Sequence, residues 1–179
     1  MRQKKFEHKI NKLRAPERVD QLEVQRVVSL CTENCHPADM LDVGTGSGLF
    51  AEAFAARGIK IIGIDPDADM IAAARFCVSE LIYSVARAEA LPFADNCFDT
   101  LFMGMVLHET AEPLLALREA RRVAQKFLAI LEWPPHETGD PPPPARRFAP
   151  PEIVSMSRAA AFSACSVIEL RQLILYLLR

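Results

Sequence analysis

The stretch that most constrains this chain is residues 40–50, which read Met-Leu-Asp-Val-Gly-Thr-Gly-Ser-Gly-Leu-Phe. Residues 40–43 are predicted to form a short buried strand, and an apolar helix begins at Leu49. The glycines between them allow positive φ angles and let a ligand lie against the main chain. The free N–H groups of the following helix point at the same place. We therefore expect a nucleotide-type pocket at the carboxyl end of a parallel strand.

The spacing of the glycines indicates which ligand is bound. A dinucleotide fold has Gly-x-Gly-x-x-Gly, but here Leu49 stands at the third position. The stretch resembles the first motif of class I methyltransferases that use S-adenosylmethionine (SAM). The resemblance implies that Asp42 lies near the methionine end of SAM. It also implies that the turn packs on the ligand through Gly44, Thr45, Gly46 and Gly48. From these residues alone, another nucleotide or a plain tight turn remains open.

A second strand is predicted over Lys60–Asp65, because its continuous apolar run is typical of a parallel strand buried on both faces. Asp65 closes this strand about 20 residues after the first glycine, where an acid can accept hydrogen bonds from ribose hydroxyls. The alternative is that Asp65 caps the next helix. The resemblance further places Pro66 and Met70 against the adenine, although core packing explains Met70 equally well.

A second motif follows the predicted third strand, residues 83–86. Residues 87–99 carry Arg-Ala-Glu-Ala-Leu-Pro-Phe and then Phe-Asp, which is similar to the D-A-E-x-L-P-F … F-D signature of a methyltransferase subgroup. That subgroup includes ubiquinone and menaquinone biosynthesis enzymes. Its members carry an adenine-binding Asp where this chain has Arg87, and arginine cannot accept a hydrogen bond. We therefore expect Ala88 and Glu89 to contact the adenine, with Leu107 also lining the cofactor.

The fourth strand, residues 99–104, leads to the predicted catalytic edge. The chain lacks the Asn/Asp-Pro-Pro-aromatic motif of enzymes that methylate DNA adenine or glutamine, which argues against those substrates. His108 is the candidate general base, since histidine can take up a proton near neutral pH. The alternative is a histidine that packs on the cofactor or the core. Glu109 is a further candidate.

Strands and helices alternate from residue 40 to residue 133, which predicts a parallel sheet with right-handed crossovers. Two further strands, residues 165–171 and 173–178, are too close for a crossover helix and are predicted to form an antiparallel hairpin. The expected fold is one doubly wound, Rossmann-like α/β domain with a seven-stranded, mostly parallel sheet. The other predicted helices cover residues 17–34, 50–57, 67–79, 112–123 and 151–161, and the fifth strand covers residues 126–133.

The single domain is divided into an N-terminal arm and helix (1–36), a cofactor-binding core (37–133), a proline-rich loop (134–151) and a C-terminal helix and hairpin (152–179). The basic arm, residues 1–18, is either a lid over the active site or a solvated tail. The proline-rich loop leaves the carboxyl end of the fifth strand, so we read it as a substrate wall or lid. The alternative is a stiff connector. Its candidate substrate contacts are Trp133, His136, Arg146 and Arg147.

Composition excludes several other classes. The net charge of −2 gives no electrostatic reason to expect a nucleic-acid partner. We expect no membrane span, since no run of about 18 apolar residues occurs, and the start does not resemble a signal peptide. Five scattered cysteines are expected to be reduced thiols, which favours a cytoplasmic location. Cys31, Cys35 and His36 are too few ligands for a metal site, so no metal is expected.

These observations predict SAM-dependent methyl transfer to a small-molecule acceptor. Two alternatives belong to other classes. A nicotinamide-dependent oxidoreductase is disfavoured by Leu49 and by the lack of a second domain. A SAM-binding module without catalysis remains open, because Arg87 departs from the motif and a fold does not determine a function. The sequence does not identify the acceptor or the oligomeric state.

Overall fold

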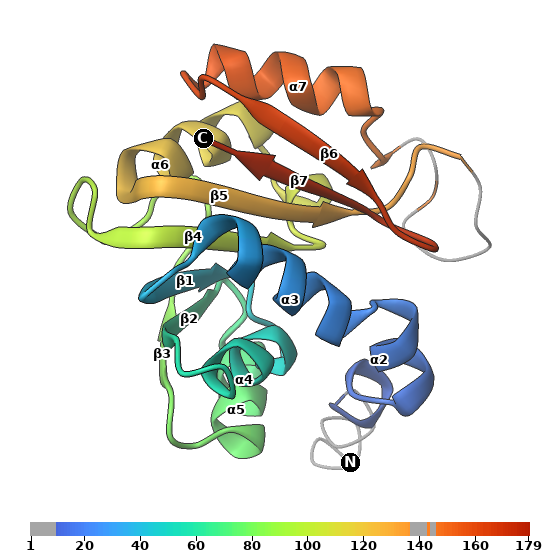
Figure 1. Ribbon diagram of the computed structural model, residues 1–179. Coiled ribbons are helices and arrows are strands. Elements are labelled where there is room, and N and C mark those ends of the chain that lie inside the picture. The colour runs from blue at the N-terminus through green and yellow to red at the C-terminus, as the bar shows by residue number, and fades with distance from the viewer. Residues whose placement is uncertain (1–9, 137–142, 144–145) are drawn as a thin grey trace.

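The computed structural model describes residues 10–136, 143 and 146–179 of the chain. Its centre is a seven-stranded sheet with the strand order β3-β2-β1-β4-β5-β7-β6 (Figure 1). The sheet therefore has the predicted number of strands and the mixed character that the sequence indicated. The strands are β1 (Asp39–Val43), β2 (Lys60–Asp65), β3 (Ile82–Val85), β4 (Phe98–Gly104), β5 (Ala124–Glu132), β6 (Cys165–Glu169) and β7 (Ile174–Leu178).

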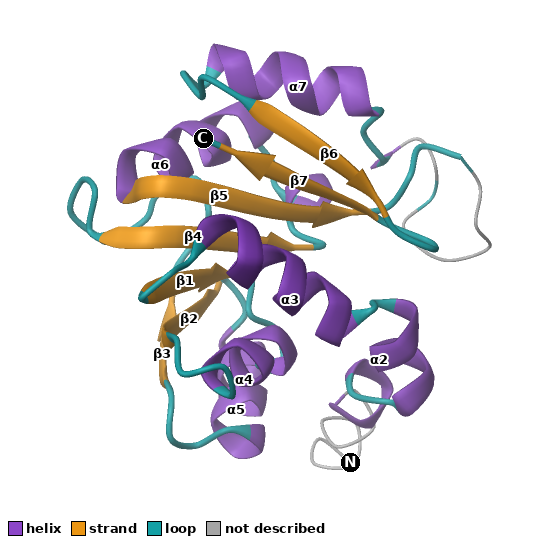
Figure 2. Ribbon diagram, in the orientation of Figure 1, coloured by secondary structure: helices purple, strands orange, loops and turns teal. Residues whose placement is uncertain are grey.

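Helices cover both faces of this sheet (Figure 2). One hydrophobic cluster packs α3, α4 and α5 against one face, and a second packs α6, α7 and the short 3-10 helix η1 against the other. The elements are α2 (Pro16–Gln21), α3 (Val24–Cys35), α4 (Leu49–Ala55), α5 (Ala68–Cys77), η1 (Leu107–Glu109), α6 (Pro113–Val123) and α7 (Pro150–Ala159). This two-sided coverage explains why the central strands read as continuous apolar runs.

The first five strands pair in parallel, and the predicted C-terminal hairpin is antiparallel. Its second strand, β7, pairs with β5, so β6 lies at the edge of the sheet although it precedes β7 in the chain. The reversal of strand order lies between β1 and β4. Ligands of doubly wound sheets bind at such a switch point, beyond the carboxyl ends of the strands.

One predicted element was wrong. The single helix expected over residues 17–34 is two helices, α2 and α3, separated at Glu23. Glu23 has a left-handed backbone (φ 46°) and is nevertheless buried. Its carboxylate accepts a hydrogen bond from the backbone N–H of Arg171 (2.6 Å) and another from Arg26 (2.9 Å). This tertiary contact with the β6–β7 turn holds a conformation that local helix propensity disfavours.

The described part of the N-terminal arm lies against the helices that follow the first two strands. Ile10 is buried and packs with Met70 and Ala73 of α5. Arg14 donates a hydrogen bond to the Ser47 carbonyl (2.9 Å) and pairs with Glu52 of α4. Residues 1–9 of the predicted arm, and residues 137–142 and 144–145 of the predicted proline-rich loop, lie outside the described residues.

Candidate functional site

The glycine turn between β1 and α4 has the predicted positive φ angles: 72° at Gly44, 56° at Gly46 and 76° at Gly48. The Thr45 N–H donates to the Ile64 carbonyl (2.8 Å), which fixes the turn against the end of β2. A Cβ at Gly44 would overlap the Val106 side chain, whereas a Cβ at Gly46 would meet no protein atom within 4 Å. Gly46 therefore faces open space, where a ligand can approach the main chain.

Asp42 is buried below this turn, with 2 % of its surface exposed. Burial raises the pKa of the Asp42 carboxyl to about 7, and the nearby Asp65 charge adds to the rise. The Thr45 hydroxyl opposes the shift by donating a hydrogen bond to the carboxylate (2.6 Å). The site thus holds a carboxyl group that changes its charge near neutral pH.

Asp65 fastens the glycine turn to the end of β2. Its carboxylate accepts hydrogen bonds from the backbone N–H of Gly46 (3.0 Å) and of Asp67 (2.9 Å). The N-cap of α5 is Asp67, whose side chain accepts from the Asp69 N–H (2.8 Å). The helix-capping interpretation therefore applies to Asp67, and Asp65 is directed at the turn.

A cavity lies on each side of the turn, and Gly44 lines both. The first has a volume of about 200 Å³ and lies between the ends of β1, β3 and β4. The second has a volume of about 140 Å³, and its walls include Asp42, the turn and the described end of the N-terminal arm. The first is lined by Val43, Gly44, Pro66, Ala86, Arg87, Ala88, Glu89, Val106, Glu109 and Thr110. The second is lined by Leu13, Arg18, Leu22, Asp42, Gly44, Thr45, Gly46, Ser47, Leu49, Phe50, Gly104 and Met105.

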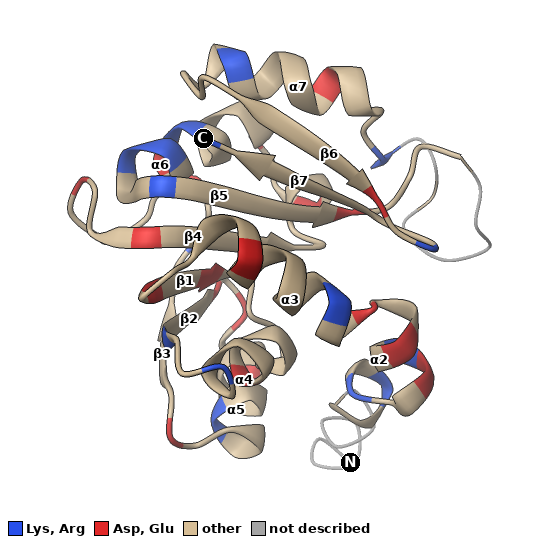
Figure 3. Cartoon of the chain, viewed as in Figure 1, with Lys and Arg blue, Asp and Glu red and all other residues tan. Residues whose placement is uncertain are grey.

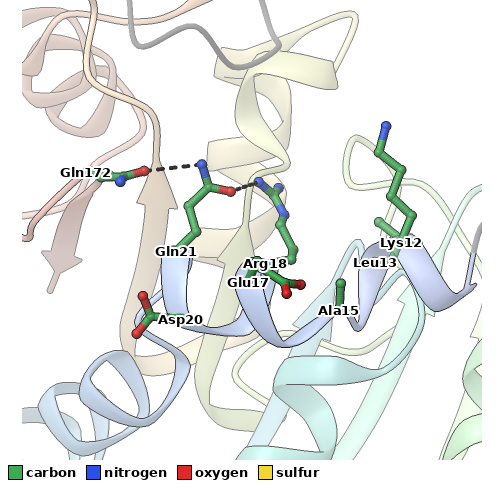
Figure 4. A pocket seen from close by; sticks show the side chains of 8 residues that line it. All are labelled: Lys12, Leu13, Ala15, Glu17, Arg18, Asp20, Gln21 and Gln172. Atoms are coloured by element: carbon green, nitrogen blue, oxygen red, sulfur yellow. Dashed lines mark hydrogen bonds between the residues drawn. The ribbon is translucent and has the colours of Figure 1, made fainter.

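A third and larger cavity, of about 780 Å³, lies beside the second (Figure 4). Leu13 and Arg18 line both of them. The Arg18 guanidinium lies over the Trp133 ring at 5.4 Å, and Arg147 also lies 5.3 Å from the centre of this ring. Arg147 is buried and donates to the carbonyls of Pro134 (3.3 Å) and His136 (2.8 Å). Two predicted loop contacts, Trp133 and Arg147, thus form a buried stack beneath Arg18.

His108 lies in η1, where its imidazole is held between two carboxylates. Nδ1 lies 2.6 Å from Oε2 of Glu132, which is buried at the end of β5, and Nε2 lies 3.3 Å from Glu109. The backbone N–H of His108 also donates to Glu132 (3.2 Å). Arg146 of the proline-rich loop donates to the His108 carbonyl (3.2 Å). Sequence reasoning missed Glu132, because it lies 24 residues away and meets His108 only when β4 and β5 are paired.

Comparisons with known proteins agree with this geometry. Residues 41–127 match a family model described as a methyltransferase domain. The crystal structure of a SAM dependent methyltransferase from Aquifex aeolicus superposes with a TM-score of 0.82 at 27 % identity, covering 96 % of each chain. The chain contains a class I SAM-dependent methyltransferase domain. The match to the quinone-methylating subgroup is less specific, because only some of the similar proteins are named for that chemistry.

Two curated relatives match this methyltransferase domain over about half of the chain. An uncharacterized methyltransferase of Mycolicibacterium vanbaalenii is 38 % identical over 97 residues, which are 52 % of this chain. A demethylmenaquinone methyltransferase of Renibacterium salmoninarum is 33 % identical over 86 residues, or 48 % of this chain. The chain spans 38 % and 36 % of the lengths of these two relatives. The [4+2]-cyclase SpnF also shares the fold, with a TM-score of 0.69 at 28 % identity, covering 83 % of this chain and 61 % of the other.

The residues of the methyltransferase domain fit SAM, the donor of this family. Gly46 leaves open space above the turn, and two acids, Asp42 and Asp65, lie beneath it. An acid beside the turn suits a cationic ligand, and a carboxylate at the end of β2 suits a ribose. The two cavities flank the turn, and Gly44 belongs to the wall of both.

Of the remaining residues that were predicted to contact the cofactor, some line the first cavity and others are buried in the core. Pro66, Ala88 and Glu89 line the first cavity as expected. Met70 packs with Ile10 and Ala73, which is the alternative that the sequence left open. Leu107 differs from the expectation: it is fully buried in the core, and its neighbour Val106 lines the cavity. Val106 and Leu107 lie at the start of η1, where consecutive side chains point about 120° apart, so only one of them faces the cavity.

Arg87, the departure from the family signature, lies at the rim of the first cavity. Its side chain is 65 % exposed and lies 3.5 Å from the Glu89 carboxylate. Partial burial raises the pKa of Glu89, but hydrogen bonds from its own backbone, from the Ala111 N–H (3.0 Å) and from Arg87 outweigh burial and lower it. Glu89 is therefore ionised at neutral pH, and it can accept a hydrogen bond that Arg87 cannot.

Acidic residues are spread over many elements of the fold (Figure 3). Within the described ranges, no group of three or more His, Cys, Asp or Glu residues is placed to hold a metal ion. Cys31 and Cys35 are buried free thiols of α3, and burial raises the pKa of Cys35 to about 12. Among the described helices, none is long and apolar enough to span a membrane.

Proposed function

We propose that this protein transfers the methyl group of SAM to a small-molecule acceptor. The observation that carries the proposal is the open glycine turn above two buried acids, with a cavity on each side. Bound SAM supplies a methyl group on a positively charged sulfur, which a nucleophilic atom of the acceptor can displace in line. The acceleration then comes mainly from holding the two reactants close together in the correct orientation.

We assign the residues of the site by their positions around the turn. The backbone at Gly44, Thr45, Gly46 and Gly48 would support the cofactor. Asp65 would bind the ribose, and Pro66, Ala88 and Glu89 would enclose the adenine in the first cavity. Asp42 would lie near the methionine end, next to the second cavity. In the described structure, Met70 and Leu107 would support these contacts from the core.

A direct test is calorimetric titration with S-adenosylhomocysteine (SAH), the product of the reaction, and with NAD as a control. We expect micromolar binding of SAH and no binding of NAD. The Asp65→Ala variant should bind SAH about 1–3 kcal/mol more weakly, because a buried hydrogen-bond acceptor is lost. Unchanged affinity in this variant would remove Asp65 from the site, and absence of SAH binding by the parent protein would overturn the proposed function.

We propose His108 as the general base for acceptors that must lose a proton. With Nδ1 donating to Glu132, Nε2 would take the proton from the acceptor, and Glu109, 3.3 Å from Nε2, would stabilise the positive charge that forms. The His108→Asn variant preserves a polar group near Glu132 but cannot act as a base. With an acceptor that requires deprotonation, we expect its turnover to fall about 100-fold.

The measurements must distinguish a role of His108 as general base from a role in holding η1 against β5. The melting temperature of His108→Asn should be close to that of the parent if the base is the main role. A lower melting temperature with normal turnover by the folded fraction would instead make the His108–Glu132 pair a structural link between η1 and β5. A reduced kcat with an unchanged KM and an unchanged melting temperature would support the assignment as base.

A second function remains compatible with the fold. SpnF, a [4+2]-cyclase, shares this architecture, so the fold alone does not determine the reaction. A SAM-binding module without methyl transfer is favoured by Arg87, which replaces the adenine-binding acid of the signature. Tight SAH binding together with no turnover on a broad acceptor panel would support this alternative.

A further inference from the structure

The third cavity adjoins the second one, whose wall contains Asp42. It lies between α2 and the β6–β7 turn, and it shares Leu13 and Arg18 with the cavity beside Asp42. A molecule in the third cavity can therefore reach the methionine side of the glycine turn past Arg18. The volume of about 780 Å³ is within the range of small-molecule sites.

Six of the eight residues that line this cavity have polar or charged side chains. Its eight residues are Lys12, Leu13, Ala15, Glu17, Arg18, Asp20, Gln21 and Gln172. Four of them are charged, with two of each sign, and two more are amides. An apolar ligand would remove water from these groups without supplying hydrogen bonds, which costs free energy for each group buried. A polar ligand replaces those lost hydrogen bonds.

A chain of hydrogen bonds crosses the cavity from the N-terminal to the C-terminal part of the fold. Arg18 donates to the Gln21 amide oxygen (3.0 Å), and the Gln21 amide nitrogen donates to Gln172 (3.2 Å), as Figure 4 shows. Gln172 belongs to the β6–β7 turn, where the neighbouring Arg171 pairs with Asp20 (3.1 Å). The wall therefore has fixed amide and guanidinium groups with defined directions, which is how a pocket selects a polar ligand.

We propose that this cavity is the acceptor site and that the acceptor is a small, polar, hydrogen-bonding molecule. An isoprenoid quinone or another lipid does not match the lining, although the sequence resembles a quinone-methylating subgroup. Gln21 and Gln172 are the residues that set this preference. The inference rests on the proposed methyl transfer and adds the chemical class of the acceptor.

The only tryptophan of the chain, Trp133, reports on this cavity, because Arg18 lies over its ring. In a nitrogen-15 NMR spectrum it gives one indole N–H signal, which needs no assignment. The experiment saturates the protein with SAH and adds polar probes (benzoate, imidazole and glycinamide) or apolar probes (menadione and geraniol). We expect the polar probes to shift the indole signal and the apolar probes to leave it unchanged.

A double variant, Gln21→Leu with Gln172→Leu, tests the residues that set the preference. The dissociation constant of at least one polar probe should rise about five-fold or more, which corresponds to losing one or two neutral hydrogen bonds. The matched control is Gln25→Leu, an exposed position of α3 where the same change should have no effect. An unchanged affinity for polar probes in the double variant would contradict the assignment.

The outcomes separate this inference from the proposed function. SAH binding is measured first, and its absence would overturn the methyl-transfer proposal on which the inference depends. If SAH binds normally but menadione or geraniol shifts the indole signal more strongly than the polar probes, only the inference is overturned. A signal that no probe shifts in the SAH-bound protein would also overturn it.

Discussion

At the scale of single residues, Asp42 is a buried carboxyl whose charge changes near neutral pH. It lies beneath the glycine turn, and burial holds its pKa at about 7. A cationic ligand beside it favours the ionised form. Binding below pH 7 therefore requires that Asp42 release a proton, which reduces the apparent affinity for the ligand.

We predict that the affinity for SAM rises as the pH increases from 5.5 to 7.5, by up to about tenfold, because the deprotonated fraction of Asp42 grows through its pKa. In Asp42→Asn this dependence should disappear, since the amide does not titrate. Calorimetry at several pH values, in buffers of different ionisation enthalpy, measures both the affinity and the proton released. A pH dependence that persists in Asp42→Asn would assign the titration to another group.

The glycines of the turn offer a matched pair at the same scale. Gly46 and Gly58 both have positive φ and open space around the position of a Cβ. Alanine at either position should destabilise the fold by about 1–2 kcal/mol, which is the cost of a left-handed conformation for an L-residue. Only Gly46→Ala should also abolish SAH binding, because its methyl group would occupy the space above the turn. Urea unfolding and calorimetry measure the two effects, and equal SAH binding by both variants would place the ligand elsewhere.

At the scale of elements, the break between α2 and α3 connects the two ends of the fold. Within the described contacts of this break, Glu23 accepts hydrogen bonds from both sides of the junction. Arg26 of α3 donates one of them, and the backbone N–H of Arg171 in the β6–β7 turn donates the other. The same turn contacts α2 through Asp20 and Gln21. The wall of the third cavity therefore depends on this junction.

We predict that Glu23→Ala lowers the free energy of unfolding by about 1–3 kcal/mol, because a partly buried backbone N–H and a charged partner lose their acceptor. The control Arg26→Ala removes only the half-exposed partner and should cost less than about 1 kcal/mol. Urea titration of both variants gives the comparison. Equal small losses would mean that the Arg171 N–H finds another acceptor.

The same junction shows what local patterns cannot predict. The apolar stripe of residues 17–34 is helical on both sides of Glu23, so periodicity correctly indicated helix. The break depends on Arg171, about 150 residues later, and no local signal contains that contact. By contrast, the strands and the glycine turn were predicted well because each is specified by its own run of residues.

At the scale of the whole molecule, the sequence predicted the fold because alternating strands and helices admit few topologies. Three of the residues that it singled out, Asp42, Gly44 and Gly46, line the cavities beside the turn. It did not identify Arg18, Gln21 or Gln172 as the wall of a cavity. These residues come from opposite ends of the chain, and only the assembled sheet brings them together.

The position of β7 has a consequence for how the molecule is made. On the ribosome β6 emerges before β7, yet β7 must lie between β6 and β5. The edge of β5 therefore stays open while the first five strands are already able to assemble. An open apolar strand edge can pair with other chains. In the nascent protein the edge of β5 is therefore exposed, whereas in the folded protein β7 covers it. Pairing of β7 with β5 covers this edge, and the β6–β7 turn places Gln172 within hydrogen-bond distance of Gln21 in α2, at the wall of the third cavity.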